Sequence, residues 1–435
     1  MARFLSSSHS HRSKDSSQDY IPLDNSSIIY PPSEAKYNSI VFRLSAELKE
    51  TVKPALLLQA LNDILERLPY FKSRLREGFF WYFLTPNSAA PRIFEDGPRP
   101  CARIIKDASL DGYLFRVSYY SKRIAVDFFH ALTDGGGGKT FLLSLIARYF
   151  EIQGKVIGSD PAIISCKTKP ARWETEDQFQ HLYRKVPFPA SIRHSYHYCG
   201  LLSDRTFFVS GEAQLDSLKL AARKIGLTVN ELFAAILVQI FLKKEEIEKK
   251  KAPIQLSIPI GLRPVYNLDT MRNFSLFAVV SIDPRLGPYT LAEIGKIIHL
   301  QMQMQVNTKE LDRLVRRNLS GERNLFVRFV PNIIKKPFFK ILSDMLGDSQ
   351  YTMTVSNLGN IKIPSSMSNL IDRFDFFLAP NKKNVQECGV VGYKDKVVIN
   401  FNSYLRDDVS VEQEFFSTLV KMGIPVKIWS NRRSD

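Results

Sequence analysis

Cysteine is scarce in this chain of 435 residues. The four cysteines are Cys101, Cys166, Cys199 and Cys388. No two of them form a Cys-x-x-Cys pair, and none pairs with a histidine at the spacing of a metal site. This pattern disfavours a disulfide-stabilised secreted fold and a cysteine-based zinc site. We therefore expect reduced, individually packed thiols, no metal ion, and a cytoplasmic protein.

Long hydrophobic runs are also absent. The longest apolar run covers residues 232–242, which is shorter than the roughly 20 residues that a membrane-spanning helix needs. We interpret it as a buried helix. The first 18 residues have no apolar segment of the kind found in secretory signals, and their composition predicts a disordered tail.

Acidic residues are in deficit, with 44 Asp and Glu against 60 Lys and Arg, which gives a net charge of +16. Such a balance suits nucleic acid, an anionic membrane surface or a phosphate-rich ligand. No nucleic-acid-binding motif accompanies it, so we expect no nucleic-acid partner. Residues 311–345 carry eight basic and three acidic side chains among apolar ones. This spacing favours core helices with lysines that reach solvent, and peripheral membrane contact is the alternative.

Strand and helix patterns alternate along the whole chain. In the first half, strand patterns cover residues 37–46, 79–84, 112–120 and 123–130, and helix patterns cover 55–68 and 140–150. In the second half, strand patterns cover 205–209, 254–260, 274–282, 352–356, 374–378, 387–393, 396–402 and 425–429. Helix patterns there cover 212–224, 231–242 and 411–422, and Thr228 or Asn230 is expected to cap the second of these. The interleaving predicts a mixed α/β protein.

One run combines a histidine, a carboxylate and a glycine turn. Residues 127–139 read Asp-Phe-Phe-His-Ala-Leu-Thr-Asp-Gly-Gly-Gly-Gly-Lys, which spaces His130 and Asp134 as His-x-x-x-Asp-Gly. The preceding alternation places His130 at the end of a buried strand, where a general base is held rigidly. Alone the motif is weak, because a histidine satisfied by a backbone group gives the same pattern. The strand before it and the helix pattern after it favour a functional role.

With this motif, the chain resembles the acyltransferase superfamily of chloramphenicol acetyltransferases, peptide-synthetase condensation domains, plant BAHD acyltransferases and wax-ester synthases. Within it, the chain is most similar to free-standing bacterial alcohol acetyltransferase-like proteins. The matching segments span nearly the whole chain; they include Tyr20-Ile-Pro-Leu-Asp24, Leu68-Pro-Tyr-Phe-Lys72, Gly78-Phe-Phe-Trp-Tyr82, Ile258-Pro-Ile-Gly-Leu-Arg263, Asn273-Phe274 and Ser356-Asn-Leu-Gly359. Two features depart from particular branches. Residue 129 is Phe rather than the second histidine of wax-ester synthases, and the Asp-Phe-Gly-Trp-Gly motif of plant BAHD enzymes is absent.

The resemblance implies a two-lobed chloramphenicol-acetyltransferase-like fold of the α/β class. Each lobe would be a mixed sheet with packed helices, and the active-site tunnel would run between the lobes. The implied division is a disordered tail at 1–18, an N-terminal lobe with the His-x-x-x-Asp-Gly motif at 19–165, a connection at 166–204, and a C-terminal lobe at 205–435. A monomer is expected.

The resemblance also implies roles for residues of the motif. His130 would be the general base, and the Gly135 amide would donate a hydrogen bond to the developing oxyanion. Asp134 would be structural, and it would pair with Arg263, placed on a strand of the second half. For Arg263, an exposed side chain is the alternative; for residues 136–138, loop slack is the alternative to close approach of substrate.

Ser356 and Asn357 would face the tunnel and bind substrate, with a plain strand-end turn as the alternative. The implied reaction moves an acyl group from a thioester, with acyl-CoA as the expected co-substrate, to an alcohol or amine, and it needs no metal. Two alternatives stay open. One is a condensation-type enzyme that acts on a carrier-protein-bound substrate, and the other is a non-catalytic member of the fold that binds a lipid or a partner.

Overall fold

A five-stranded mixed sheet organises the first part of the molecule. The computed structural model describes residues 20–187, 194–323, 330–335 and 350–432, so the tail expected at 1–18 lies outside the described residues. The strand order is β12 (Ile371–Leu378), β2 (Val41–Leu48), β7 (Arg123–Phe129), β6 (Phe115–Tyr120) and β5 (Ile93–Glu95). Neighbouring strands are antiparallel except β5 and β6, which are parallel.

A seven-stranded mixed sheet organises the second part. Its order is β10 (Ser275–Ile282), β9 (Ile254–Gly261), β11 (Met353–Ile361), β13 (Gln386–Tyr393), β14 (Lys396–Leu405), β8 (Leu202–Gln214) and β15 (Val426–Ser430). β11 runs parallel to both of its neighbours. A small third sheet joins β1 (Ile21–Pro22), β4 (Tyr82–Pro86) and β3 (Ser73–Glu77). Two mixed sheets confirm the predicted mixed α/β class.

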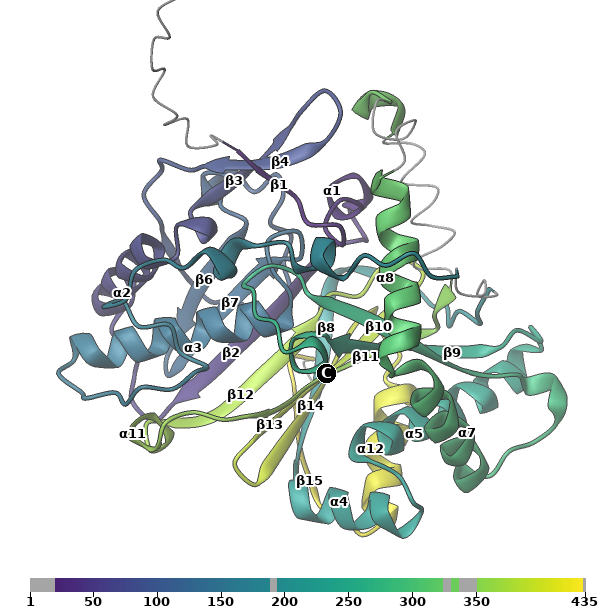
Figure 1. Cartoon of the computed structure of the whole chain (residues 1–435). Coiled ribbons are helices and arrows are strands. Elements are labelled where there is room, and N and C mark those ends of the chain that lie inside the picture. The colour runs from purple at the N-terminus through teal and green to yellow at the C-terminus, as the bar shows by residue number, and fades with distance from the viewer. Residues whose placement is uncertain (1–19, 188–193, 324–329, 336–349, 433–435) are drawn as a thin grey trace, which may run out of the picture.

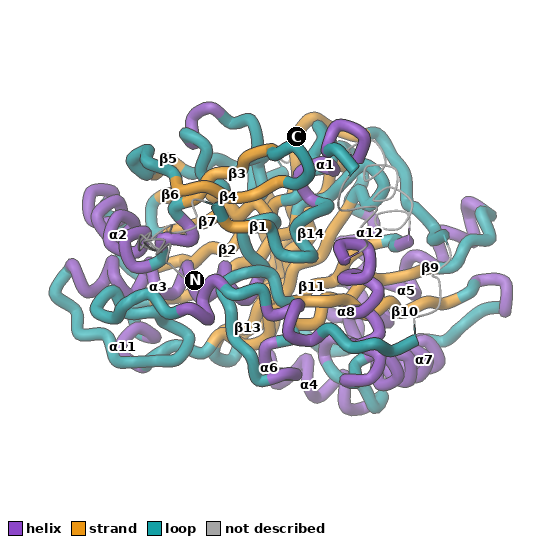
Figure 2. Tube along the Cα trace, turned by 45° about the horizontal axis from the view of Figure 1, so that its top comes forward, coloured by secondary structure: helices purple, strands orange, loops and turns teal. Residues whose placement is uncertain are grey.

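The longer helices cover the two large sheets. Against the first sheet pack α2 (Pro54–Arg67) and α3 (Gly135–Ile152), and against the second pack α4 (Leu215–Lys224), α5 (Val229–Glu248), α7 (Leu291–Gln305) and α12 (Ser410–Lys421). Figure 1 shows these two groups at opposite ends of the molecule, and Figure 2 shows the strands between them. Other described helices include α1 (Tyr30–Ser33), α6 (Arg263–Tyr266), α8 (Thr308–Arg323) and α11 (Ser365–Ser368), and residues 332–335 form one further helical turn. Short 3-10 turns cover Pro69–Phe71, Ala108–Leu110, Arg172–Thr175, Gln178–Leu182 and Pro284–Leu286.

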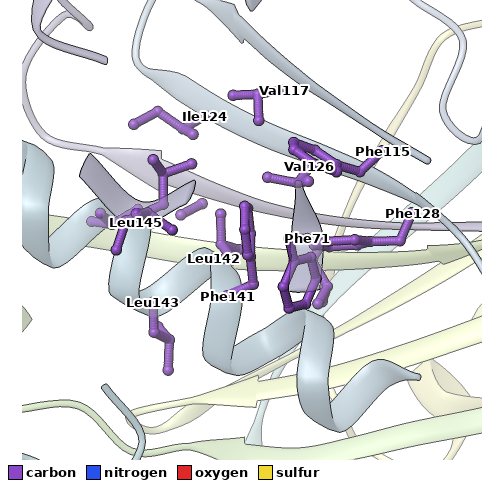
Figure 3. Close-up of a cluster of buried hydrophobic side chains, with 14 of the residues drawn as sticks. Phe71, Phe115, Val117, Ile124, Val126, Phe128, Phe141, Leu142, Leu143 and Leu145 are labelled. Carbon is purple, nitrogen blue, oxygen red and sulfur yellow. The ribbon is translucent and has the colours of Figure 1, made fainter. Parts of the chain in front are cut away.

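Tilted and edge-to-face aromatic rings fix α3 against the first sheet (Figure 3). The ring centres of Phe71 and Phe141 are 4.6 Å apart, and those of Phe128 and Phe141 are 5.6 Å apart. All three rings are fully buried, and burial of a phenylalanine contributes about 1.5–3 kcal/mol. Because Phe128 lies on β7 and Phe141 on α3, this cluster holds rigid the two elements that flank His130.

Thr228, one of the two expected capping residues, caps the amino end of α5. Thr228 Oγ accepts a hydrogen bond from the Glu231 amide at 3.3 Å, and Glu231 accepts one from the Thr228 amide at 2.8 Å. This capping box begins α5 at Val229, two residues before the predicted start. Among the described residues, no single helix has the length and apolar composition of a membrane span; only α4 and α5 taken together meet that test, and they are bent by 70°.

Some predicted strands begin or end elsewhere. Residues 79–81 belong to a turn, and the strand starts at Tyr82, because the Gly78 amide donates to the Trp81 carbonyl and closes a hairpin with the unpredicted strand β3. Residues 212–214, predicted as helix, continue β8 because they pair with β14 and β15. The strand predicted from residue 37 begins at Val41.

One strand from the C-terminal half crosses into the first sheet. β12, from the C-terminal half, pairs with β2 over seven residues of the first sheet. β12 also contacts the second sheet, since the Asn400 and Asn402 side chains donate to the carbonyls of Phe376 and Leu378 at 3.2 and 2.8 Å. A Cβ on Gly389 would lie 2.2 Å from the Phe376 carbonyl oxygen, so only glycine allows this approach. β12 therefore joins the lobes.

All four cysteines are free. Cys101 and Cys388 are buried, and burial raises the pKa of both thiols. Cys199 is exposed, so the expectation of individually packed thiols is wrong at that position. It lies in an irregular segment before β8, where no element covers it.

Candidate active site

His130 follows the last residue of β7, as the alternating pattern predicted. Its backbone amide donates to the Ile40 carbonyl at 2.9 Å, which continues the contact between β7 and β2 by one residue. The side chain is half-buried. The rings of Tyr30 and Phe42 flank the imidazole, each with its centre 5.1 Å from that of His130. The histidine is therefore held in a partly shielded aromatic setting.

The second half supplies the partner of the imidazole. His130 Nδ1 lies 2.9 Å from Oδ1 of Asn273. The orientation of this amide follows from its other contacts, because Asn273 Nδ2 donates to Asp24 Oδ2 at 3.2 Å and to Ser27 Oγ at 2.8 Å. An ionised carboxylate can only accept, so the Asn273 oxygen must face the histidine. The hydrogen bond then requires a proton on Nδ1, which leaves the lone pair of Nε2 for chemistry.

The chain of contacts continues into the N-terminal segment. Ser27 Oγ donates to Asp24 Oδ1 at 2.6 Å, and Arg272 Nε lies 3.7 Å from Asp24 Oδ2. All four residues of this group, Asp24, Ser27, Arg272 and Asn273, are buried. In the sequence, Asp24 and Asn273 are distinguished only as parts of segments that match the acyltransferase superfamily, and neither has an expected role. A hint was present in the polar residues Asp24 and Asn273, each next to an apolar residue, but nothing in their spacing links positions 249 residues apart.

Asp134 turns away from the histidine and joins the two halves. Its carboxylate accepts two hydrogen bonds from the Arg263 guanidinium, both at 2.9 Å. It also accepts from the Phe274 amide at 2.8 Å and caps α3 by accepting from the Gly137 amide at 3.0 Å. The structure thus brings together the expected pair. Arg263 opens the short helix α6 rather than lying on a strand, because Pro264 ends the ladder there.

The charges of this pair are shielded from water. Burial raises the pKa of the Asp134 carboxyl, but the Arg263 guanidinium and the two backbone amides outweigh burial and hold that pKa below its usual range. Arg263 also donates to the carbonyls of Thr270 and Arg272 at 2.9 Å, so its guanidinium organises the loop that carries Asn273. Asp134 therefore contacts both the first turn of α3 and the segment that carries the histidine partner.

The four glycines form the first turn of α3 rather than a loop. A Cβ at Gly136 would lie 2.6 Å from Arg263 Nη1, and one at Gly137 would lie 2.4 Å from the Met271 carbonyl oxygen. The alternative of loop slack for residues 136–138 is therefore wrong, since protein atoms occupy the space around them. At Gly135 a Cβ would lie 2.6 Å from Leu358 of β11. Helix and second sheet thus approach closely beside His130.

The two predicted residues on β11 differ in placement. Ser356 is buried and shares a strand face with Leu358, the side chain that meets Gly135. Asn357 points to the opposite face, and its Oδ1 accepts from the Gly359 amide at 2.8 Å. This contact accompanies a shift in the pairing of β11 with β13 between Asn357 and Asn360, where Gly359 has φ 71°. Asn357 therefore lies at an irregularity inside β11, which continues to Ile361. Ser356 stays a candidate to face the site.

Lys139 lies in the first turns of α3, near the ion pair of Arg263 and Asp134. Burial, and then the neighbouring Arg263, lower the pKa of the Lys139 amine. Among the described residues, no three His, Cys, Asp or Glu side chains lie close enough to hold a metal ion.

Two mixed sheets that meet along β12, with a histidine at their junction, define the two-lobed chloramphenicol-acetyltransferase-like fold of the coenzyme A-dependent acyltransferases and condensation domains. TRI101 of F. sporotrichioides, solved with coenzyme A and T-2, matches with TM-score 0.64 and 11% identity over 94% of this chain and 99% of its own. Polyketide synthase associated protein 5 from Mycobacterium tuberculosis matches with TM-score 0.56 and 15% identity over 92% and 97%.

The starter condensation domain of rhizomide synthetase RzmA, solved with C8-CoA and Leu-SNAC, matches with TM-score 0.56 and 10% identity over 93% of this chain and 94% of its own. No protein-family model and no curated protein sequence matches the chain. At these identities the likeness shows the fold, which confirms the predicted two-lobed architecture. The finer similarity to bacterial alcohol acetyltransferase-like proteins stays a prediction.

Proposed function

We propose that the protein transfers an acyl group from a thioester, with acyl-CoA as the expected donor, to an alcohol or an amine. The observation that carries this proposal is the hydrogen bond from His130 Nδ1 to Asn273, which leaves Nε2 as the basic nitrogen. The fold supports the reaction class, because solved relatives on this scaffold hold coenzyme A or an acyl-CoA.

In the proposed reaction, Nε2 of His130 takes the proton from the acceptor hydroxyl or amine as its oxygen or nitrogen attacks the thioester carbonyl. The tetrahedral intermediate collapses with cleavage of the carbon–sulfur bond. The imidazolium returns its proton to the departing thiolate, so the products are an ester or amide and a free thiol. Asn273 accepts from Nδ1 throughout and holds the ring in one orientation. No covalent acyl-enzyme and no metal are required.

The developing oxyanion needs a donor close to His130. The Gly135 amide is our candidate, because it opens α3 and the amides of a first helical turn have no partner within the helix. One donor of this kind stabilises a transition state by about 3–4 kcal/mol. Ser356 is the candidate donor from the second sheet, since it shares a strand face with Leu358 beside Gly135. A tunnel between the lobes at this point remains our prediction for substrate access.

A condensation-type reaction on a carrier-protein-bound thioester is the second candidate. The match to a domain from the third module of tyrocidine synthetase B, over 93% of this chain, favours it. The chemistry at His130 would be the same, because a phosphopantetheine thioester presents the same carbonyl and the same leaving thiolate. The two candidates differ only in what carries the thiol.

Thiol release tests both candidates. Purified protein is incubated with a panel of acyl-CoAs and mixed small alcohols and amines, and in parallel with acyl groups loaded on a carrier protein. We expect thiol release with at least one free acyl-CoA, and loss of that release in His130→Ala, whose melting temperature should stay near wild type. Release from carrier-bound donors alone would select condensation chemistry. A folded protein that releases no thiol from either donor would leave a binding role and contradict the proposal.

A further inference from the structure

The turn between β3 and β4 meets a segment of the second half at one end of the molecule. The Asn332 amide donates to the Phe79 carbonyl at 2.7 Å, and Lys335 Nζ donates to the Phe80 carbonyl at 3.1 Å. The same ammonium lies 3.4 Å from the centre of the Trp81 ring. In Figure 1, the β3–β4 turn and the short green helix above α8 lie together at the upper end. The two segments therefore form one surface.

Large apolar side chains on this surface face solvent. Phe79 is 71% exposed, Ile333 is 79% exposed and Ile334 is 59% exposed. Single exposed apolar residues are ordinary on proteins, but a group of three that meets across two segments indicates an interaction surface. We call these three residues, with Phe80 and Trp81, the apolar tip.

The sequence around the apolar tip is basic. Residues 311–345 carry eight Lys and Arg against three Asp and Glu, and the whole chain has a net charge of +16. Leu311, Val315 and Leu319 of α8 are buried, so the expectation of a core helix holds for the described part 311–323; residues 324–329 and 336–345 lie outside the described residues. On β3, the exposed Arg76 stands beside the exposed Glu77. The described residues of this stretch, 311–323 and 330–335, carry five Lys and Arg against two Asp and Glu.

We propose that the apolar tip docks on an anionic phospholipid surface. A turn and a one-turn helix that carry Phe and Ile can enter the headgroup region, where Trp and a neighbouring Lys are favoured side chains. The basic sequence supplies charge complementary to anionic lipid, which a hydrophobic protein partner would not require. This inference concerns where the protein acts, and it stands whether or not His130 transfers acyl groups.

Vesicle sedimentation tests the proposal with the full chain. Wild type is mixed with vesicles of phosphatidylcholine alone and with vesicles that also contain phosphatidylserine, at low and high salt. The variants are Phe79→Ser and the double variant Ile333→Ser with Ile334→Ser. The matched control is Ile247→Ser, which removes an 80% exposed isoleucine near the end of α5. All four positions are exposed, so melting temperatures should stay equal.

We expect wild type and Ile247→Ser to sediment with the anionic vesicles, less strongly at high salt. Phe79→Ser should bind roughly tenfold more weakly, because the largest inserted side chain is lost. A wild type that fails to sediment, or a Phe79→Ser variant that binds like wild type, would overturn the proposal. Equal binding to neutral vesicles would overturn its anionic part. Size-exclusion chromatography that shows a dimer lost in Phe79→Ser would assign the surface to a second copy of the chain instead.

Discussion

Replacement of Asn273 by leucine should separate the tautomer of His130 from the integrity of the fold. The amide makes three buried contacts, at 2.9 Å to His130, 2.8 Å to Ser27 and 3.2 Å to Asp24. Leucine has a similar volume but accepts no hydrogen bond, so Nδ1 loses the acceptor that fixes its proton. A net hydrogen bond of about 1 kcal/mol corresponds to a roughly fivefold loss in the ratio of the competent tautomer to the other one. Looser orientation of the ring adds to this loss.

We therefore expect Asn273→Leu to lower kcat by about 10- to 100-fold with KM close to wild type. The fold should lose about 1–3 kcal/mol, because polar partners are left buried without the amide. Ser210→Ala is the matched control: the Ser210 hydroxyl also donates to a buried asparagine oxygen, that of Asn400, at 2.6 Å, but on the second sheet. It should cost comparable stability and leave kcat unchanged.

A readout independent of turnover comes from nitrogen NMR of histidine-labelled protein, which is tractable because the chain has seven histidines. Wild type should show His130 with the proton on Nδ1, and Asn273→Leu should show a mixture of the two tautomers. The reasoning is refuted if wild-type His130 carries its proton on Nε2. It is also refuted if Asn273→Leu keeps the wild-type kcat on a substrate that His130→Ala cannot use.

Three further predictions concern stability. Arg263→Met should destabilise the fold by about 3–5 kcal/mol at pH 7, because it leaves the Asp134 carboxylate buried without its cation. Since the pKa of Asp134 is lowered in the folded state, this difference should be present above about pH 4 and shrink as the pH falls further. Urea unfolding of both proteins at several pH values measures it. Gly137→Ala should lower the free energy of unfolding by about 1–3 kcal/mol, because its Cβ would lie 2.4 Å from the Met271 carbonyl oxygen. In the control Gly97→Ala, the Cβ meets no atom within 4 Å, so the melting temperature should stay within error of wild type. Glu412→Gln should raise the melting temperature at pH 7 but not at pH 4. Burial raises the pKa of the Glu412 carboxyl, so its charge destabilises the folded protein only as the pH rises through that pKa. An equal change in melting temperature at both pH values would contradict this prediction.

Much of the fold was predictable because local patterns decide it. The hairpin of β6 and β7 alternates cleanly around Ser121 and Lys122, and α2 begins at a proline and ends before one. The predictions that were wrong concern elements whose structure depends on contacts between distant parts of the chain. Residues 212–214 have a helical pattern and become strand only because β14 and β15 lie on either side of β8. The crossing of β12 into the first sheet likewise depends on an edge of β2 that no local pattern reveals.

The candidate site shows the same division. The spacing of His130 and Asp134 was visible within five residues, and the motif also predicted that the carboxylate turns away from the ring. The acceptor of the imidazole proton was not visible. Asn273 is an ordinary polar residue before a strand, and its meaning depends on Asp24 and Ser27, which lie some 250 positions earlier. A sequence pattern can identify a base, but the group that orients the base is set by tertiary contacts.

The loop at 263–274 connects both parts of this site. One end holds Asp134 through Arg263, and the other end holds His130 through Asn273. Arg263 also binds the carbonyls of Thr270 and Arg272, so the loop is rigid between its two contacts. Separation of the lobes would break the ion pair and free the imidazole in one movement. The basic nitrogen is therefore defined only in the docked arrangement, and docking of the lobes is itself a condition for the proposed chemistry.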